Sequence, residues 1–327
     1  MVAHFIDIGQ ANATLLEFQC GTVLIDAGTQ LTATKESTDK LTAYLDEFFS
    51  RRTDLNKTIN TIIITHNHKD HTGSLPKLQK KYTIKNIVTT TLNLGSNVRN
   101  VIKNEEGIKC DTIIDYSRVV DVLPNGVTSD IIDPLHCTND PEITILSGRI
   151  ERKPNGWSKG IFSNPNSHSL AIRVKFGASS FLFTGDMQEE SINFMLDKYA
   201  AHLDALNVDV YEVGHHGSHN ATTPELLNAM SPKIAVISSS HAEDHRRSTG
   251  FAFGHPNIKV VQSLDTSLST NRAPLAEAAV FSEGWDEDSE TNESMETVEV
   301  KKAIYCTCWD GTIKLSAKTD GTIKKIE

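Results

Sequence analysis

Apolar residues along this chain fall into short runs of strand length, separated by longer stretches with helical spacing. In residues 36–50, Leu41, Tyr44, Leu45 and Phe48 recur every three or four positions, which predicts an amphipathic helix. Further helices are predicted at 73–82, 189–203 and 223–230. Short apolar segments between glycine and polar residues predict strands at 4–10, 13–18, 21–28, 58–66, 86–90, 169–176, 179–186, 208–213 and 232–240.

Residues 92–160 follow this pattern less regularly. Short strands are predicted at 111–116, 118–123 and 130–135, followed by a loop at 152–160. We interpret the region as an elaboration of a single domain that covers residues 1–327, because the firm strands resume directly after it.

The length of 327 residues fits one large domain, and 38% hydrophobic content is ordinary for a globular protein. No apolar run approaches the ~20 residues that a membrane span needs. The first ten residues lack the basic start of a signal peptide and reach Asp7 early. These features predict a cytoplasmic location without membrane insertion.

The net charge of −10 is unevenly distributed. Eight acidic residues and no basic residue lie between Glu283 and Glu299, so the remainder of the chain carries only −2. This segment predicts a solvated, mobile acidic insertion at 283–299. A nucleic-acid partner is therefore not excluded by the total charge.

The five cysteines are odd in number, which argues against a disulfide framework in a cytoplasmic protein. Cys306 and Cys308 are one residue apart, without the spacing of a zinc knuckle. We therefore expect buried thiols.

The densest chemistry lies between a predicted strand and a predicted helix. His66, His68, Asp70 and His71 place four potential metal ligands within six residues. In an extended loop His66 and His68 point the same way and can share one metal, while Asp70 and His71 can reach a second. Imidazole and carboxylate ligands suit zinc, and also manganese or iron.

One loop cannot complete two metal sites, and three later segments at predicted strand ends offer more ligands. His168 precedes a strand, Asp186 ends one, and His215 and His216 follow another. An isolated aspartate after a strand is commonly a helix cap. Beside the other candidates, Asp186 is better explained as a bridging ligand.

These residues resemble the metallo-β-lactamase superfamily, whose five motifs occur here in order: Asp26 in LIDAG, the HxHxDH run, His168, Asp186 and a late histidine. Within it, the strings HFIDIGQANATLLE, THNHKDHTGSL and VYEVGHHGSHNATTPELL resemble the metallohydrolase domain of ComEC-type DNA-uptake proteins. The chain departs from that branch at Ala11 of GQAN, where GQGD or GQGN is usual, and in having His168.

The resemblance implies an α/β fold, the αββα four-layer sandwich. It implies two divalent metals, zinc or manganese, with Asp186 bridging them. His66, His68 and His168 would hold the first metal, and Asp70, His71 and one of His215 or His216, preferably His216, the second. Asp26 would orient a ligand histidine, and His215 would contact substrate. His255 in GHPN is either a residue at the substrate rim or an ordinary loop histidine.

The function implied is a binuclear hydrolase that uses a metal-bridging hydroxide, with Asp70, Asp186 and His215 in catalytic roles. A phosphodiesterase or nuclease acting on nucleic acid or another phosphodiester fits the branch, and so does an enzyme of this type working beside a partner protein. The alternatives are a small-substrate metallohydrolase for a lactone, lactam, thioester or phosphoester, and an interaction module with a relict metal site.

Overall fold

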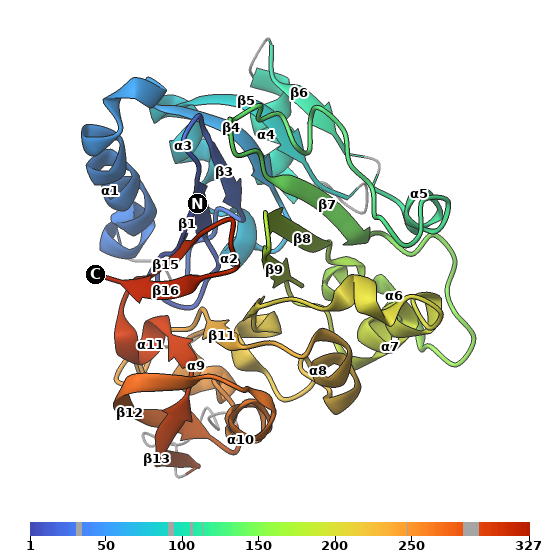
Figure 1. The fold of residues 1–327 in the computed structure, drawn as a ribbon, viewed down its shortest axis with the longest axis vertical. Helices are drawn as coiled ribbons and strands as arrows, with labels where there is room; N and C mark the ends of the chain where they lie inside the picture. The colour runs from blue at the N-terminus through green and yellow to red at the C-terminus, as the bar shows by residue number, and fades with distance from the viewer. Residues whose placement is uncertain (31–34, 91–94, 105–106, 113, 247, 284–293) are drawn as a thin grey trace.

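Two β-sheets face each other in the computed structural model, and helices cover the outer side of each sheet (Figure 1). The structure describes residues 1–30, 35–90, 95–104, 107–112, 114–246, 248–283 and 294–327. This arrangement confirms the expected α/β four-layer αββα sandwich.

The first sheet joins the N-terminal strands to two strands from the C-terminus. Strands β3, β4, β5 and β6 run parallel, and the other neighbours are antiparallel. Within the described ranges the order is β16 (Ile323–Ile326), β15 (Ile313–Ala317), β1 (Val2–Phe5), β2 (Thr14–Glu17), β3 (Thr22–Ile25), β4 (Thr58–Ile63), β5 (Thr83–Val88) and β6 (Lys109–Asp111).

The second sheet comes from strands between residues 142 and 306. Strands β9, β10, β11 and β14 run parallel, while β7 and β8 continue the sheet in antiparallel fashion. Among the described residues the order is β14 (Ile304–Cys306), β11 (Ile234–Ile237), β10 (Val210–Glu212), β9 (Ser179–Phe183), β8 (Ala171–Phe176) and β7 (Glu142–Ser147).

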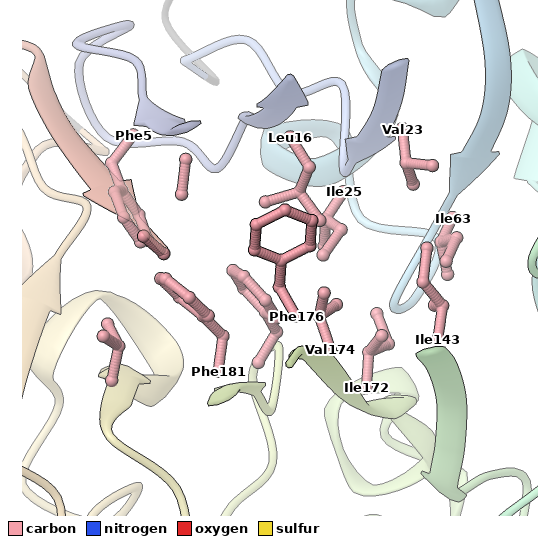
Figure 2. Close-up of a cluster of buried hydrophobic side chains, with 14 of the residues drawn as sticks. Phe5, Leu16, Val23, Ile25, Ile63, Ile143, Ile172, Val174, Phe176 and Phe181 are labelled. Atoms are coloured by element: carbon pink, nitrogen blue, oxygen red, sulfur yellow. The ribbon is translucent and has the colours of Figure 1, made fainter. Parts of the chain in front are cut away.

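The central core lies between the two sheets. Figure 2 shows Leu16 and Ile25 of the first sheet opposite Val174 and Phe181 of the second. Because strand side chains alternate between faces, Val174 points to this core, whereas Ala171 belongs to the outer cluster. Both faces of the second sheet are thus buried, as its nearly continuous apolar strands require.

The outer layers are formed by the amphipathic helices. Helices α1 (Lys35–Arg51), α3 (Leu75–Lys81) and α4 (Gly95–Asn104) cover the first sheet, where Leu45 and Phe48 pack among its residues. Helices α7 (Glu189–Lys198), α8 (Pro224–Met230) and α10 (Ile258–Ser267) cover the second sheet. In the described part of the chain, no helix is both long and apolar enough to cross a membrane.

Short helical segments connect these elements, and several carry site residues. They are the helices α2 (Lys69–Thr72), α5 (Tyr116–Val120), α6 (Lys159–Ser163), α9 (Gly250–Phe253) and α11 (Thr307–Asp310), and the 3-10 turns η1 (Thr53–Leu55), η2 (Pro165–His168), η3 (Leu203–Leu206) and η4 (Gly214–Gly217).

Two strand predictions in the irregular region are wrong. The segment 118–123 begins in helix α5, which buries Val119 and leaves Val120 exposed, and 130–135 forms turns. Both segments are apolar enough for a strand, but in the described residues neither forms a ladder with another strand. The predicted strand at 111–116 overlaps β6 only at Asp111.

The acidic segment also differs from the expected loop. Strand β12 (Asn271–Phe281) pairs antiparallel with β13 (Met295–Lys302), which places Glu296 opposite Val280 and Glu299 opposite Glu277. The acids at 296 and 299 are therefore part of a ribbon that packs Val300 against α10. The remaining prediction of a mobile loop falls mainly on 284–293, which lie outside the described residues.

The expectation of unpaired thiols is wrong for four of the five cysteines. Cys20 and Cys137 form one disulfide, and Cys306 and Cys308 form another, which leaves Cys110 as the free thiol. The Cys20–Cys137 pair lies 117 residues apart in sequence, so sequence spacing gave no indication of it.

Replacing both Cys20 and Cys137 by serine is expected to lower the free energy of unfolding by about 2–4 kcal/mol, because the disulfide closes a long loop in the unfolded chain. Urea unfolding of both forms without reductant measures this difference. Cys110→Ser is the matched control. Equal stability of the double variant and the parent would show that the pair is not bonded in solution.

Candidate metal centre

The predicted site residues come from loops at the carboxyl ends of parallel strands. Asp26 follows β3, His66 follows β4, and Asp186 and His216 follow β9 and β10. Parallel strands direct these ends to one edge of a sheet, where α/β proteins bind their ligands. The two facing sheets thus bring segments more than one hundred residues apart into one centre.

Backbone contacts fix the HxHxDH loop against its neighbours. The carbonyl of Asp70 accepts from the amide of Asn12 at 2.9 Å, and that of His71 accepts from Ala27 at 2.8 Å. A Cβ on Gly28 would lie 1.8 Å from the Asp70 carbonyl oxygen. Only glycine lets the loop after β3 approach this closely, so the LIDAG sequence is needed for shape as well as for Asp26.

Asp70, His71, Asp186 and His216 form the first group, in which one ligand atom from each lies within 4.8 Å of the others. His71 Nδ1 donates to Asp26 Oδ2 at 2.6 Å, which directs its Nε2 toward Asp186 Oδ1 at 3.2 Å. His216 Nδ1 donates to the Ser238 carbonyl at 2.7 Å, and its Nε2 lies 3.3 Å from Asp70 Oδ2. Anchoring one ring nitrogen while the other faces a common point is typical of metal-binding histidines.

The nitrogen and oxygen atoms that face each other in this group are suitable ligands for a divalent cation. His71 Nε2 and Asp186 Oδ1 are both buried and have no hydrogen-bond partner among the described residues. With the His71 proton on Nδ1, these atoms are two acceptors facing each other, which is unfavourable without a positive charge between them. Burial alone would lower the pKa of His71, but the Asp186 and Asp26 carboxylates raise it well above its usual value, because both place negative charge beside the ring.

His66, His68 and Asp186 form the second group. His66 Nε2 lies 3.1 Å from His68 Nδ1 and 3.7 Å from Asp186 Oδ2. The other Asp186 oxygen belongs to the first group. One carboxylate therefore contacts both sets of ligands, the position that a bridging ligand occupies.

His168 is not brought to either group. Its Nδ1 accepts from the Ile150 amide at 3.1 Å, and its Nε2 lies 2.6 Å from the Phe162 carbonyl. The η2 turn thus places both ring nitrogens against backbone groups, and neither is available to a metal in this arrangement. The expected ligand role of His168 stays a prediction without support from these contacts.

Asn166 is a site residue that the sequence analysis missed. It is buried and lines the cavity, its Oδ1 has no hydrogen-bond partner within the described ranges, and its Nδ2 lies 3.4 Å from His215 Nε2. An amide oxygen can ligate a divalent metal. The signal was its place in Asn-Ser-His-Ser, where attention went to the imidazole two residues later.

His215 and His216 adopt left-handed backbone conformations, with φ of 50° and 55°. Such conformations cost energy for residues other than glycine and are concentrated at functional sites. They turn His216 toward the first group and leave His215 outside both groups, with its Nε2 3.8 Å from Asp186 Oδ2.

A cavity of about 450 Å³ opens over the metal groups. Burial lowers the pKa of His215, and burial together with nearby His215 and His216 lowers the pKa of His255 well below its usual value. Both imidazoles are therefore neutral hydrogen-bonding groups. The lining residues are Gln10, His68, Lys69, Asp70, Asn166, Asp186, His215, His216, Phe253 and His255.

Replacing Asp26 by asparagine is expected to weaken metal binding about 10- to 100-fold. The Thr65 amide and hydroxyl donate to Asp26, and His71 donates to the same carboxylate. An asparagine NH₂ facing His71 would force the proton onto Nε2 and remove the lone pair that a metal needs. Chelator competition measures the dissociation constant. Asp209→Asn is the control, and an unchanged constant for Asp26→Asn would contradict this role.

Comparison with known proteins gives one family match and several relatives. The model for the family described as the metallo-beta-lactamase superfamily matches residues 6–241. The chain is 26% identical to ComE operon protein 3 of Bacillus subtilis over 79% of its length, and 25% identical to Recombination protein 2 of Haemophilus influenzae over 72%. These matches cover 30% and 24% of the two relatives, so the chain spans less than a third of either.

The solved structures that resemble the chain are distant. The metallo-beta-lactamase fold protein YhfI from Bacillus subtilis aligns over 82% of this chain and 94% of its own, with 14% identity and a TM-score of 0.42.

Proposed function

Because the chain belongs to the metallo-β-lactamase superfamily, we propose that it is a binuclear metal-dependent phosphodiesterase that cleaves nucleic acid. The family and the ligand clusters support a metal-dependent hydrolase in general. The phosphodiester substrate is the part that we add as a proposal.

One observation carries that choice. His215 and His255 lie on the cavity wall with ring centroids 5.6 Å apart, beside the metal groups but in neither of them. Neutral imidazoles next to a cationic centre can form hydrogen bonds with a phosphodiester, and His255 offers a donor for one of its non-bridging oxygens. The resemblance to ComEC-type proteins supports the same substrate class.

Each residue has an assigned task in this proposal. His66 and His68 hold one zinc or manganese ion, Asp70, His71 and His216 hold the second, and Asp186 contacts both. Bound divalent ions supply Lewis-acid polarisation of the phosphoryl oxygens and a water of lowered pKa. The side-chain oxygen of Asn166 adds a further metal ligand, and His215 contacts the substrate.

The cavity volume favours one alternative, a small-substrate hydrolase, because pockets of this size commonly hold a single small molecule. For a nucleic acid, the cavity would receive only the scissile phosphate and its neighbours. A partner protein that presents the strand is compatible with this arrangement.

A substrate panel tests the proposal. Single- and double-stranded DNA, RNA, bis(p-nitrophenyl) phosphate, a lactone and a chromogenic lactam are each incubated with the metal-loaded protein. Cleavage of a nucleic acid together with the generic diester is the expected result. Cleavage of the diester alone would indicate a smaller phosphodiester, and cleavage of only the carbonyl substrates would overturn the proposal.

A further inference from the structure

Gln10 is buried in the loop after β1, and its side-chain orientation is fixed by two donors. Its Oε1 lies 2.9 Å from the Ser239 hydroxyl and 3.2 Å from the backbone nitrogen of Ser240. A backbone N–H can only donate, so the atom that it reaches must be the amide oxygen. The remaining atom is therefore the NH₂ group.

That NH₂ group faces His255. The distance from Gln10 Nε2 to His255 Nδ1 is 3.2 Å, and both residues are buried. An amide NH₂ has no acceptor capacity, so Nδ1 must accept. The His255 ring is then neutral with its proton on Nε2, because a proton on Nδ1 would bring two donors together.

The protonated Nε2 of His255 is available to donate a hydrogen bond in the cavity. Within the described residues, the side-chain hydrogen bond found for His255 is the one at Nδ1, and His255 lines the cavity over the metal groups. His215 lies edge-on to the ring at 5.6 Å, and His215 Nε2 reaches to within 3.8 Å of Asp186. The donor is thus placed beside the metal centre.

The segment 238–240, which follows β11, contacts both the candidate ligand His216 and the Gln10 side chain that faces His255. The Thr307 hydroxyl accepts from the Ser239 amide at 2.9 Å and donates to the Ser239 carbonyl at 2.8 Å. Ser238, one residue earlier, accepts from His216 Nδ1. The segment 238–240 therefore contacts both the Gln10 side chain and His216.

We propose that Gln10 is a positioning residue that locks His255 in the Nε2–H tautomer, so that His255 donates a hydrogen bond to a non-bridging oxygen of the substrate phosphodiester. The tautomer follows from the hydrogen bonds alone, whereas the identity of the acceptor rests on the proposed function.

Gln10→Glu tests the lock with an isosteric change. A glutamate keeps one oxygen for Ser239 and Ser240 but presents the other, an acceptor, to His255. The proton should then move to Nδ1, and Nε2 should become an acceptor. Ring ¹⁵N chemical shifts of histidine-labelled protein, assigned by the loss of signals in His255→Gln, read the tautomer without any substrate.

The kinetic expectation is a fall in kcat/KM for diester hydrolysis of about 10- to 100-fold in Gln10→Glu, the worth of a donor to a charged group. Gln262→Glu, which adds the same charge on the exposed face of α10, should leave the rate unchanged. His255→Gln retains an amide donor near the Nε2 position and should make the rate insensitive to Gln10→Glu.

The outcomes separate the two parts of the inference. A wild-type His255 with its proton on Nδ1, or one unchanged by Gln10→Glu, overturns the lock, and wild-type spectra suffice if the variant does not fold. The expected tautomer shift with an unaltered rate overturns the substrate contact. A wild-type protein inactive on every diester refutes the proposed function, while the spectra still decide the tautomer.

Discussion

Asp186→Asn is expected to reduce kcat for diester hydrolysis roughly a thousandfold or more, the effect of losing metal ions that each supply several kcal/mol. One Asp186 oxygen lies 3.2 Å from His71 Nε2 and the other lies 3.7 Å from His66 Nε2. The amide that replaces it keeps the shape but loses the charge that offsets the metals. Bound metal, measured by elemental analysis, should fall below two equivalents along with the rate.

Asp133→Asn is the matched control for this change. Burial raises the pKa of Asp133 to about 6, and its Oδ2 accepts from the Ile143 amide, away from the metal groups. The substitution therefore removes a partly buried carboxylate without touching the centre. An Asp186→Asn protein that keeps both its metals and its rate would contradict the bridging position.

His68→Ala is the second large effect, with an expected loss of about a hundredfold or more in kcat and of one metal equivalent. His68 is half-buried, and its Nδ1 lies 3.1 Å from His66 Nε2. Removing its side chain leaves the other ligand group in place, which consists of Asp70, His71, Asp186 and His216. Because no core contact is lost, the free energy of unfolding should change by only about 0.5 kcal/mol.

Urea unfolding and metal analysis on the same His68→Ala sample separate activity from stability. His202→Ala, an exposed histidine before η3, serves as the control for a lost imidazole. Full activity of His68→Ala would refute a role for the second ligand group, and unfolding of the variant would show that His68 supports the fold instead.

The grouping of the candidate ligands was largely predictable, because these residues are concentrated in one short motif and at strand ends. The HxHxDH loop follows β4, and Asp186 and His216 follow β9 and β10. Parallel strands direct these ends to one edge, so the positions of the apolar segments in the sequence predict which residues come together.

What the sequence left undetermined depends on side-chain orientation and on long-range contacts. The η2 turn places His168 against Phe162 and Asn166 in the cavity, which spacing alone cannot distinguish. Gln10 meets His255 across 245 residues of sequence. The helix α5 and the β12–β13 ribbon were missed for a related reason, because whether an apolar segment pairs as a strand depends on its neighbours.

The most direct test of a binuclear diesterase is to restore Mn²⁺ or Zn²⁺ to chelator-treated protein in measured equivalents. Bound metal and hydrolysis of bis(p-nitrophenyl) phosphate are recorded on the same samples. The account predicts no activity without metal and a rate that rises to a plateau at two bound equivalents. Activity in the metal-free protein, or no diester hydrolysis at two bound equivalents, would contradict it.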